Sequence, residues 1–133
     1  MTICELRAFD LEAILALYAG IGWTNYTDRP EMVKNAYENS LLTLGAYDGD
    51  RLVGVIRTVG DGFSVVFIQD ILVLPEYQRQ GIGTQLLKTV MDHFSQVYQL
   101  ELMTDNTLKT VSFYRSVGLI KADEIQCCAF IRP

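Results

Sequence analysis

The sequence has little positive charge, which argues against a nucleic-acid partner. Its 133 residues include 11 Lys and Arg against 16 Asp and Glu, so the formal net charge is −5. A protein that binds nucleic acid shows a basic patch, because contacts with the phosphate backbone supply much of the affinity. We therefore expect no nucleic-acid partner.

Cysteine and histidine are scarce as well. The three cysteines, Cys4, Cys127 and Cys128, are an odd number without zinc-site spacing, and the one histidine, His93, is not placed to help. The simplest interpretation of these cysteines is that they are small buried hydrophobic side chains. Reduced thiols are typical of the cytoplasm. We expect no metal and a cytoplasmic location.

Long apolar runs, linkers and repeats are absent. No run approaches the roughly 20 residues of a membrane span, and the N-terminus lacks a basic segment followed by an apolar one. We therefore expect no membrane partner. Hydrophobic residues make up 50% of the chain, which is enough for a packed core. We predict a single domain over residues 1–133.

The hydrophobic pattern changes period along the chain and so predicts its elements. Asp10 is a candidate helix cap, and Asp28 with Glu31 has the spacing of a capping box before a helix that begins near Pro30. The predicted strands cover residues 2–6, 41–47, 51–59, 63–74, 98–103 and 125–131, and the predicted helices cover about 10–19, 30–37, 82–94 and 107–116. The fold class is α/β (α+β), a mixed, mainly antiparallel central sheet flanked by helices, in the order β-α-α-β-β-β-α-β-α-β.

Two glycines stand one residue apart between a predicted strand and a predicted helix. They belong to the segment Gln78-Arg79-Gln80-Gly81-Ile82-Gly83, which follows an apolar run that stops at Pro75. A helix start presents unpaired backbone N–H groups and roughly half a unit of positive charge, which suits a phosphate. A Cβ at either glycine would hinder the turn or keep a ligand's oxygens away from the backbone. The segment predicts a phosphate site.

The spacing of this segment narrows the choice of phosphate ligand. It lacks the longer loop ending in Lys-Ser/Thr that binds ATP, and the strand before it does not open the chain as in a dinucleotide fold. The pattern Gln/Arg-x-x-Gly-x-Gly/Ala instead resembles the acetyl-CoA pyrophosphate loop of the GNAT N-acetyltransferases. The segment Phe113-Tyr114-Arg115-Ser116-Val117-Gly118-Leu119 resembles the family's FYxxxGF segment, and the two motifs stand in the family's order.

The resemblance implies an enzyme, an N-acetyltransferase that uses acetyl-CoA as cosubstrate and needs no metal. It also implies that the strands over 63–74 and 98–103 splay apart to admit the pantetheine arm. Backbone groups of Ile71, Leu72 and Val73 would hold that arm and the thioester carbonyl. The pyrophosphate would be held by Arg79, Gln80, Gly81, Ile82, Gly83 and Thr84. Asn106 is a further cofactor contact, but it lies one residue further from Tyr114 than is common. Thr107 is the alternative contact, and helix capping is another role for Asn106.

The catalytic candidates are a tyrosine and a carboxylate. Tyr114 matches the family's tyrosine that protonates the departing thiolate, and an ordinary core aromatic is its other interpretation. Asp70 lies in an otherwise apolar strand, where a carboxylate is either working as a general base or neutralised by a partner such as Arg57. Glu101 and a water chain are the other candidates for the base. Strand alternation puts Gln69 and Asp70 on opposite faces unless a bulge intervenes.

The acceptor site is expected near the segment Gly20–Tyr26. Trp23, Tyr26 and Gln69 are the candidate substrate-binding residues, and a helix connection whose Trp plugs the core is the alternative. The resemblance implies that the acceptor is a primary amine of a small molecule, a peptide or a protein. A homodimer formed through strands is a further expectation for a short chain of this family.

Two other functions fit the same residues. A non-catalytic acyl-CoA-binding sensor would share the fold, and the presence of Tyr114 argues against it. An α/β partner-binding domain would use the glycine turn only structurally, and it would bind no coenzyme A.

Overall fold

The structure is a computed structural model that describes all residues from Met1 to Pro133. It contains two compact units, Met1–Leu102 and Met103–Pro133. The single domain over 1–133 stays a prediction.

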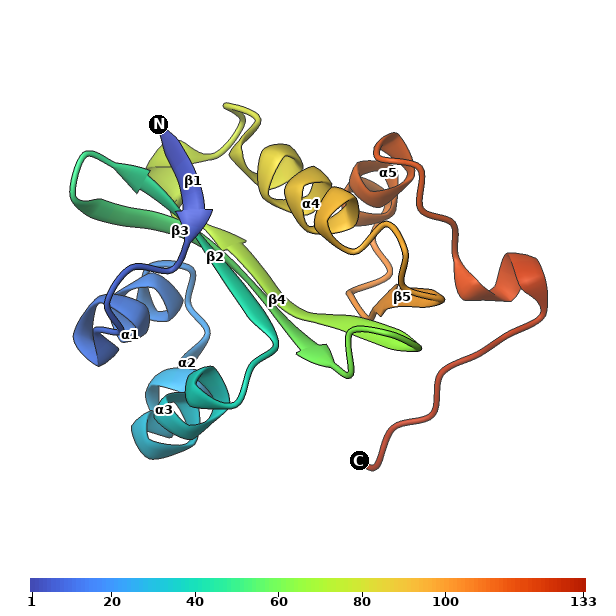
Figure 1. Ribbon diagram of the computed structural model, residues 1–133, viewed down its shortest axis with the longest axis horizontal. Helices are drawn as coiled ribbons and strands as arrows, with labels where there is room; N and C mark the ends of the chain where they lie inside the picture. Colours follow the sequence, from blue (N-terminus) through green and yellow to red (C-terminus); the bar gives the residue numbers. More distant parts are fainter. The chain divides into compact units, whose positions relative to one another are not determined.

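A five-stranded sheet forms the centre of the first unit, with the strands in chain order (Figure 1). The strands are β1 (Thr2–Glu5), β2 (Leu42–Asp48), β3 (Arg51–Gly60), β4 (Val65–Val73) and β5 (Gln99–Leu102). Only β4 and β5 pair in parallel; the other neighbours are antiparallel. The mixed, mainly antiparallel sheet predicted from the sequence is therefore confirmed.

The hairpin turns have clear local causes. Asp48 pairs with Arg51, so the first turn is two residues long, and Gly49 supplies its positive φ of 60°. In the second turn Asp61 Oδ1 accepts the backbone N–H groups of Phe63 and Ser64 at 2.8 and 2.7 Å. These bonds replace the ladder partners that a turn lacks.

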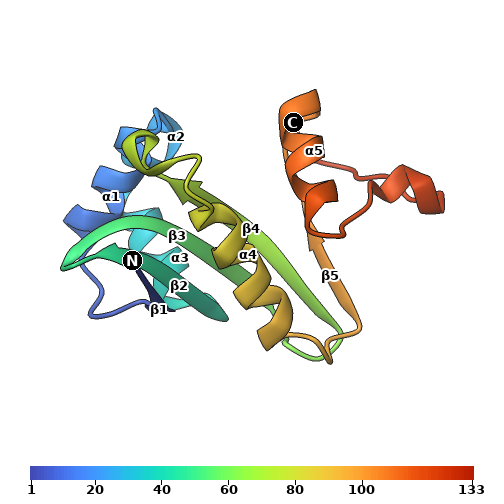
Figure 2. The ribbon, with the colours of Figure 1, turned by 90° about the horizontal axis from the view of Figure 1, so that it is seen from above.

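The helices cover both faces of this sheet (Figures 1 and 2). One face carries α1 (Leu11–Gly20), α2 (Thr24–Thr27) and α3 (Pro30–Glu38), and the other carries α4 (Ile82–His93). Asp10 caps α1 as predicted, through bonds from the N–H groups of Glu12 and Ala13. The Asp28–Glu31 capping box is wrong. The short helix α2 was not predicted, and Asp28 is its C-cap, with its N–H bonded to Thr24 O.

The core lies between the sheet and its helices. On α4, Ile82, Leu86 and Val90 recur every four residues and are buried, as the hydrophobic period predicts. Val55 and Ile56 of β3 are also fully buried. None of the helices is both long and apolar enough to cross a bilayer.

A bulge interrupts the register between β3 and β4. Arg57 lies opposite Asp70 and Thr58 opposite Ile68, so Gln69 has no residue opposite it. An extra residue in one strand changes the alternation of its side chains. Strand alternation would put Gln69 and Asp70 on opposite faces, and this bulge allows both side chains to lie on one face.

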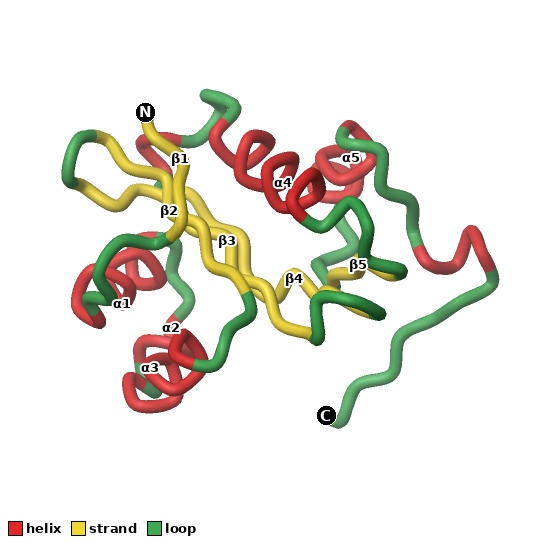
Figure 3. Tube along the Cα trace, viewed as in Figure 1, coloured by secondary structure: helices red, strands yellow, loops and turns green.

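The second unit contains one α-helix, one short 3-10 helix and loops (Figure 3). These helices are α5 (Leu108–Ser116) and η2 (Ala122–Ile125). The last strand, predicted over 125–131, is wrong. Ile125 is the last residue of η2, Gln126 caps that helix with a φ of +60°, which is not extended backbone, and the N–H of Cys127 bonds to Ala122 O at 2.9 Å.

The cysteines also differ from their predicted burial. Cys127 and Cys128 are exposed, and Cys4 is half-buried. Cys127 and Cys128 are expected on the last strand, over 125–131, so the error about their burial follows from the error about that strand.

We expect Leu86→Ala to lower the free energy of unfolding by about 2–5 kcal/mol, because it leaves a cavity in the α4 core. Urea denaturation measures the change. The control is Lys88→Ala, an exposed position on the same helix, which should leave the midpoint unchanged within error. Equal midpoints for the two variants would contradict the packing of α4 on the sheet.

Candidate functional site

The glycine turn lies at the start of α4, where the chain passes from strand to helix. Gly81 is the N-cap residue, with a left-handed φ of 82°, and Arg79 also has a positive φ, of 64°. The backbone N–H groups from Arg79 to Thr84 donate to no acceptor in the protein, and the first bond of the helix is Gln85 N–H to Gly81 O. A concave row of free N–H groups at a helix start binds anions.

Side chains anchor this turn to the sheet. Gln78 Nε2 donates to Val73 O at 2.9 Å, and the Tyr77 hydroxyl donates to Asp48 Oδ2 at 2.6 Å. Arg51 pairs with Glu76 at 2.9 Å. The two carboxylates beside the turn therefore have partners of their own, a cation for Glu76 and a phenol for Asp48.

The outer edge of β4 is open beyond Ile68. The parallel pairing with β5 ends at Ile68 and Leu102, whereas β4 continues to Val73. The N–H of Leu74 bonds to Val53 O of β3, and successive N–H groups of a strand point to alternate edges. The N–H groups of Ile71 and Val73 thus point to the open edge, and that of Leu72 points toward β3.

A buried ion pair lies on the other side of the same strand. Arg57 Nε donates to Asp70 Oδ2 at 2.8 Å, and the two side chains are 6% and 1% exposed. The partner that the sequence suggested for Asp70 is therefore present. Burial alone would lower the pKa of Arg57, but the charge of Asp70 and its hydrogen bond outweigh burial and raise it.

Three tyrosines extend this ion pair into a hydrogen-bonded cluster. Tyr18 donates to Asp70 Oδ2 at 3.0 Å and Tyr26 donates to Asp70 Oδ1 at 2.9 Å. The hydroxyls of Tyr18 and Tyr37 are 2.8 Å apart. Burial raises the pKa of each tyrosine, and the Asp70 charge raises it further, so all three phenols stay protonated.

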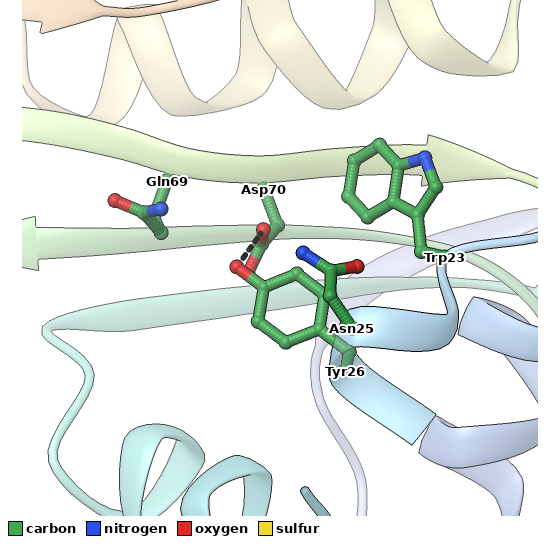
Figure 4. A pocket seen from close by; sticks show the side chains of 5 residues that line it. All are labelled: Trp23, Asn25, Tyr26, Gln69 and Asp70. Carbon is green, nitrogen blue, oxygen red and sulfur yellow. Dashed lines mark hydrogen bonds between the residues drawn. The ribbon is translucent and has the colours of Figure 1, made fainter. Parts of the chain in front are cut away.

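A pocket of about 360 Å³ opens beside this cluster (Figure 4). It is lined by Trp23, Asn25, Tyr26, Gln69 and Asp70. The structure thus brings together the three predicted substrate-binding residues and Asp70, because the bulge lets both Gln69 and Asp70 reach the pocket. Asn25 was missed, although its place between Trp23 and Tyr26 is the signal that could have found it.

The predicted acid lies in the second unit. Tyr114 is on α5 and half-buried, with its ring 5.0 Å from that of Phe113. Burial raises the pKa of the Tyr114 phenol, and a hydrogen bond with Thr104 opposes the shift. Thr107, rather than Asn106, caps α5, since its hydroxyl accepts the N–H of Thr110.

Two further predictions concern Glu101 and a metal ion. Glu101 is exposed on β5, opposite Phe67. No three His, Cys, Asp or Glu side chains are grouped so that they could hold a metal ion.

Known proteins resemble this chain over nearly its whole length. A family model described as Acetyltransferase (GNAT) domain matches residues 13–132. A GNAT-family acetyltransferase from Streptococcus pneumoniae TIGR4 has a TM-score of 0.90 and 46% identity, over 99% of this chain and 96% of that one. A ycf52-like N-acetyltransferase of Prochlorococcus marinus is 31% identical over 95% of this chain and 71% of its own length.

A more distant structure shares the fold alone. It is an aminoglycoside N-acetyltransferase solved in complex with CoA, with a TM-score of 0.76 and 16% identity. The match covers 99% of this chain and 93% of that one.

We expect Arg57→Leu to lower the free energy of unfolding by about 3–5 kcal/mol, because it leaves Asp70 buried without its cationic partner. Thermal or urea unfolding measures the loss. Arg51→Leu is the matched control, since it breaks an exposed Arg–carboxylate pair on the same strand and should change stability little. Similar small losses in both variants would contradict the role given to the buried pair.

Proposed function

Because the chain belongs to the GNAT acetyltransferase family, we propose that it transfers an acetyl group from acetyl-CoA to a primary amine of a small molecule, a peptide or a protein. The observation that carries the proposal is the row of free backbone N–H groups from Arg79 to Thr84, next to the open edge of β4. Such a row suits a diphosphate, and such an edge suits an extended amide-containing arm.

The cosubstrate supplies an activated acetyl group as a thioester, and the chain supplies the contacts that aim it. The N–H groups of Arg79, Gln80, Gly81, Ile82, Gly83 and Thr84 hold the pyrophosphate, and the Arg79 side chain adds positive charge. The N–H groups of Ile71 and Val73 hold the pantetheine arm and the thioester carbonyl, since no strand takes them. Leu72 contributes to the strand, and Asn106 is a further proposed contact.

The reaction needs two proton transfers, one to the departing thiolate and one from the acceptor amine. Tyr114 donates a proton to the departing thiolate, and a raised pKa keeps that phenol protonated until it is needed. The amine must be neutral to attack, and its ordinary pKa is near ~10. Arg57, Tyr18 and Tyr26 already donate to the Asp70 carboxylate, so we propose that the amine loses its proton through water. Asp70 and Glu101 as the base stay predictions.

The partners and the location complete the proposal. The acceptor occupies the pocket lined by Trp23, Tyr26 and Gln69. The chain acts in the cytoplasm, where its free cysteines stay reduced. A homodimer stays a prediction.

One experiment tests the function directly. Release of free thiol from acetyl-CoA is measured with a panel of small amines, polyamines, aminoglycosides and lysine peptides, and acetyl-CoA binding is measured by calorimetry. Thiol release with at least one amine supports the proposal. Binding without release from any amine would indicate a non-catalytic sensor, and absence of binding would contradict the cofactor site.

We expect Gly81→Val to weaken acetyl-CoA binding at least tenfold, which corresponds to ~1.4 kcal/mol. Valine strains a backbone with a φ of +82°, and no protein atom lies within 4 Å of the added Cβ, so the change acts on the turn and not on packing. Calorimetry measures the affinity.

The control for this variant is Gly62→Val. Gly62 has a φ of +79° and lies in the turn before β4, at the far end of the strand from Gly81. Its added Cβ would meet only Leu41 side-chain atoms, at 3.6 Å or more. Equal acetyl-CoA affinity in the two variants would count against the turn as the pyrophosphate site.

We expect Tyr114→Phe to lower kcat about a hundredfold or more, because the thiolate then leaves without its proton donor. Acetyl-CoA affinity should change little. Thiol-release kinetics measure the effect, and Tyr98→Phe, at a tyrosine that is 83% exposed, is the control. An unchanged kcat in Tyr114→Phe would remove the acid role from this residue.

A further inference from the structure

We propose that Tyr26 orients the acceptor amine through its phenol oxygen, and that Asp70 is a positioning residue that acts through Tyr26. The inference rests on the proposed function, because it concerns the acceptor side of the same reaction. In this inference, the buried cluster of Arg57, Asp70 and the tyrosines fixes the direction of the Tyr26 hydroxyl.

Three donors of the protein already occupy the Asp70 carboxylate. Arg57 and Tyr18 donate to its Oδ2, at 2.8 and 3.0 Å, and Tyr26 donates to its Oδ1, at 2.9 Å. The residue is 2% exposed. Protonation would break one of these bonds and leave Arg57 as a buried cation without an anionic partner, which is strongly unfavourable.

Tyr26 is the member of this cluster whose hydroxyl connects the ion pair to the pocket. An ionised carboxylate only accepts hydrogen bonds, so the phenol must use its one proton on Asp70. The Gln69 amide can donate to one lone pair of this oxygen, and the other lone pair can accept an N–H from a molecule in the pocket. Burial and the Asp70 charge raise the pKa of Tyr26, which keeps the phenol neutral.

The aromatic neighbours fix the direction of this phenol. The ring of Tyr26 lies 4.5 Å from that of the fully buried Tyr18 and 6.0 Å from that of Trp23, both between ring centroids. Packing on one side and the bond to Asp70 on the other leave the ring little freedom. A fixed acceptor can hold an amine nitrogen in one orientation.

The charge of the pocket narrows the acceptor class. Asp70 is the one carboxylate in the lining, and Arg57 neutralises it. The amide groups of Asn25 and Gln69 and the ring of Trp23 add hydrogen-bonding and π surfaces without net charge. A polyamine or an aminoglycoside would bring further ammonium groups that no carboxylate in the pocket can pair. The site is therefore suited to an acceptor with a single amino group.

The first test compares two tyrosine variants of the full chain in thiol-release assays. Tyr26→Phe should raise the KM of the amine about threefold to tenfold, the loss of one hydrogen bond, and leave the KM of acetyl-CoA unchanged. The control, Tyr37→Phe, removes a hydroxyl from the same cluster that does not line the pocket. Its amine KM should stay within twofold of the wild type. Equal amine KM values in Tyr26→Phe and Tyr37→Phe would overturn the inference.

The second test separates positioning from base catalysis at Asp70. In Asp70→Asn the amide oxygen can still accept from Tyr26, so the acidic limb of the kcat/KM pH profile should persist. Loss of that limb, with a fall in kcat of a hundredfold or more, would identify Asp70 as the general base and overturn its positioning role. Circular dichroism and acetyl-CoA calorimetry check that the variant is folded.

The third test needs no catalysis and so stands if the proposed function fails. Trp23 is the one tryptophan of the chain and lines the pocket, so its fluorescence reports binding there. Without acetyl-CoA, benzylamine should quench it saturably in the wild type and in Tyr37→Phe, and more weakly in Tyr26→Phe. Cadaverine, with two ammonium groups, should bind the wild type more weakly than benzylamine. No saturable quenching, tighter binding of cadaverine, or equal benzylamine affinity in the two variants would overturn the inference.

Discussion

The ion pair between Arg57 and Asp70 lies where the register of the sheet changes, and it links the proposed acceptor pocket to the central strands. Arg57 and Asp70 stand opposite each other on β3 and β4, with the bulge at Gln69 immediately beside them. The bulge lets Gln69 and Asp70 reach the same pocket. The charge of Arg57 in turn makes it possible to bury a carboxylate among three tyrosines from α1, α2 and α3. Two helices, α1 and α2, thus bond directly to Asp70, and α3 is linked to it through the bond between Tyr37 and Tyr18.

Strand β4 contributes to both proposed sites, to the donor site through its outer edge and to the acceptor site through its side chains. Its outer edge, beyond the last pair with β5, leaves the N–H groups of Ile71 and Val73 free. Its side chains at Gln69 and Asp70 line the pocket on the face that carries α1, α2 and α3. The strand then passes through Gln78, whose amide bonds back to Val73 O, into the free N–H groups at the start of α4. A single strand therefore sets the spacing between the proposed donor and acceptor sites.

Local signals in the sequence were sufficient for most of the fold. The period of α4 and the cap at Asp10 each depend on residues close together in the chain, and both are confirmed. The fold class, the GNAT family and the enzyme class are confirmed as well. The last strand failed for a physical reason: an apolar alternation shows β-propensity, but a strand forms only where another strand takes its hydrogen bonds. The positive φ of Gln126 left no signal in the sequence.

The environment of Asp70 shows why a residue's role is harder to predict than its place in a site. Its position in an apolar strand marked it as paired or working, and Arg57 was a candidate partner because hairpin strands lie side by side. Which alternative holds is decided by contacts between residues far apart in the chain: Tyr18 lies 52 positions away and Tyr26 lies 44. The bulge that gives Asp70 these neighbours adds one residue to one strand, and that changes which face a side chain reaches without altering the apolar pattern. Three donors already occupy this carboxylate, so for the same residue that looks catalytic in sequence we propose the task of orienting the hydroxyl of Tyr26.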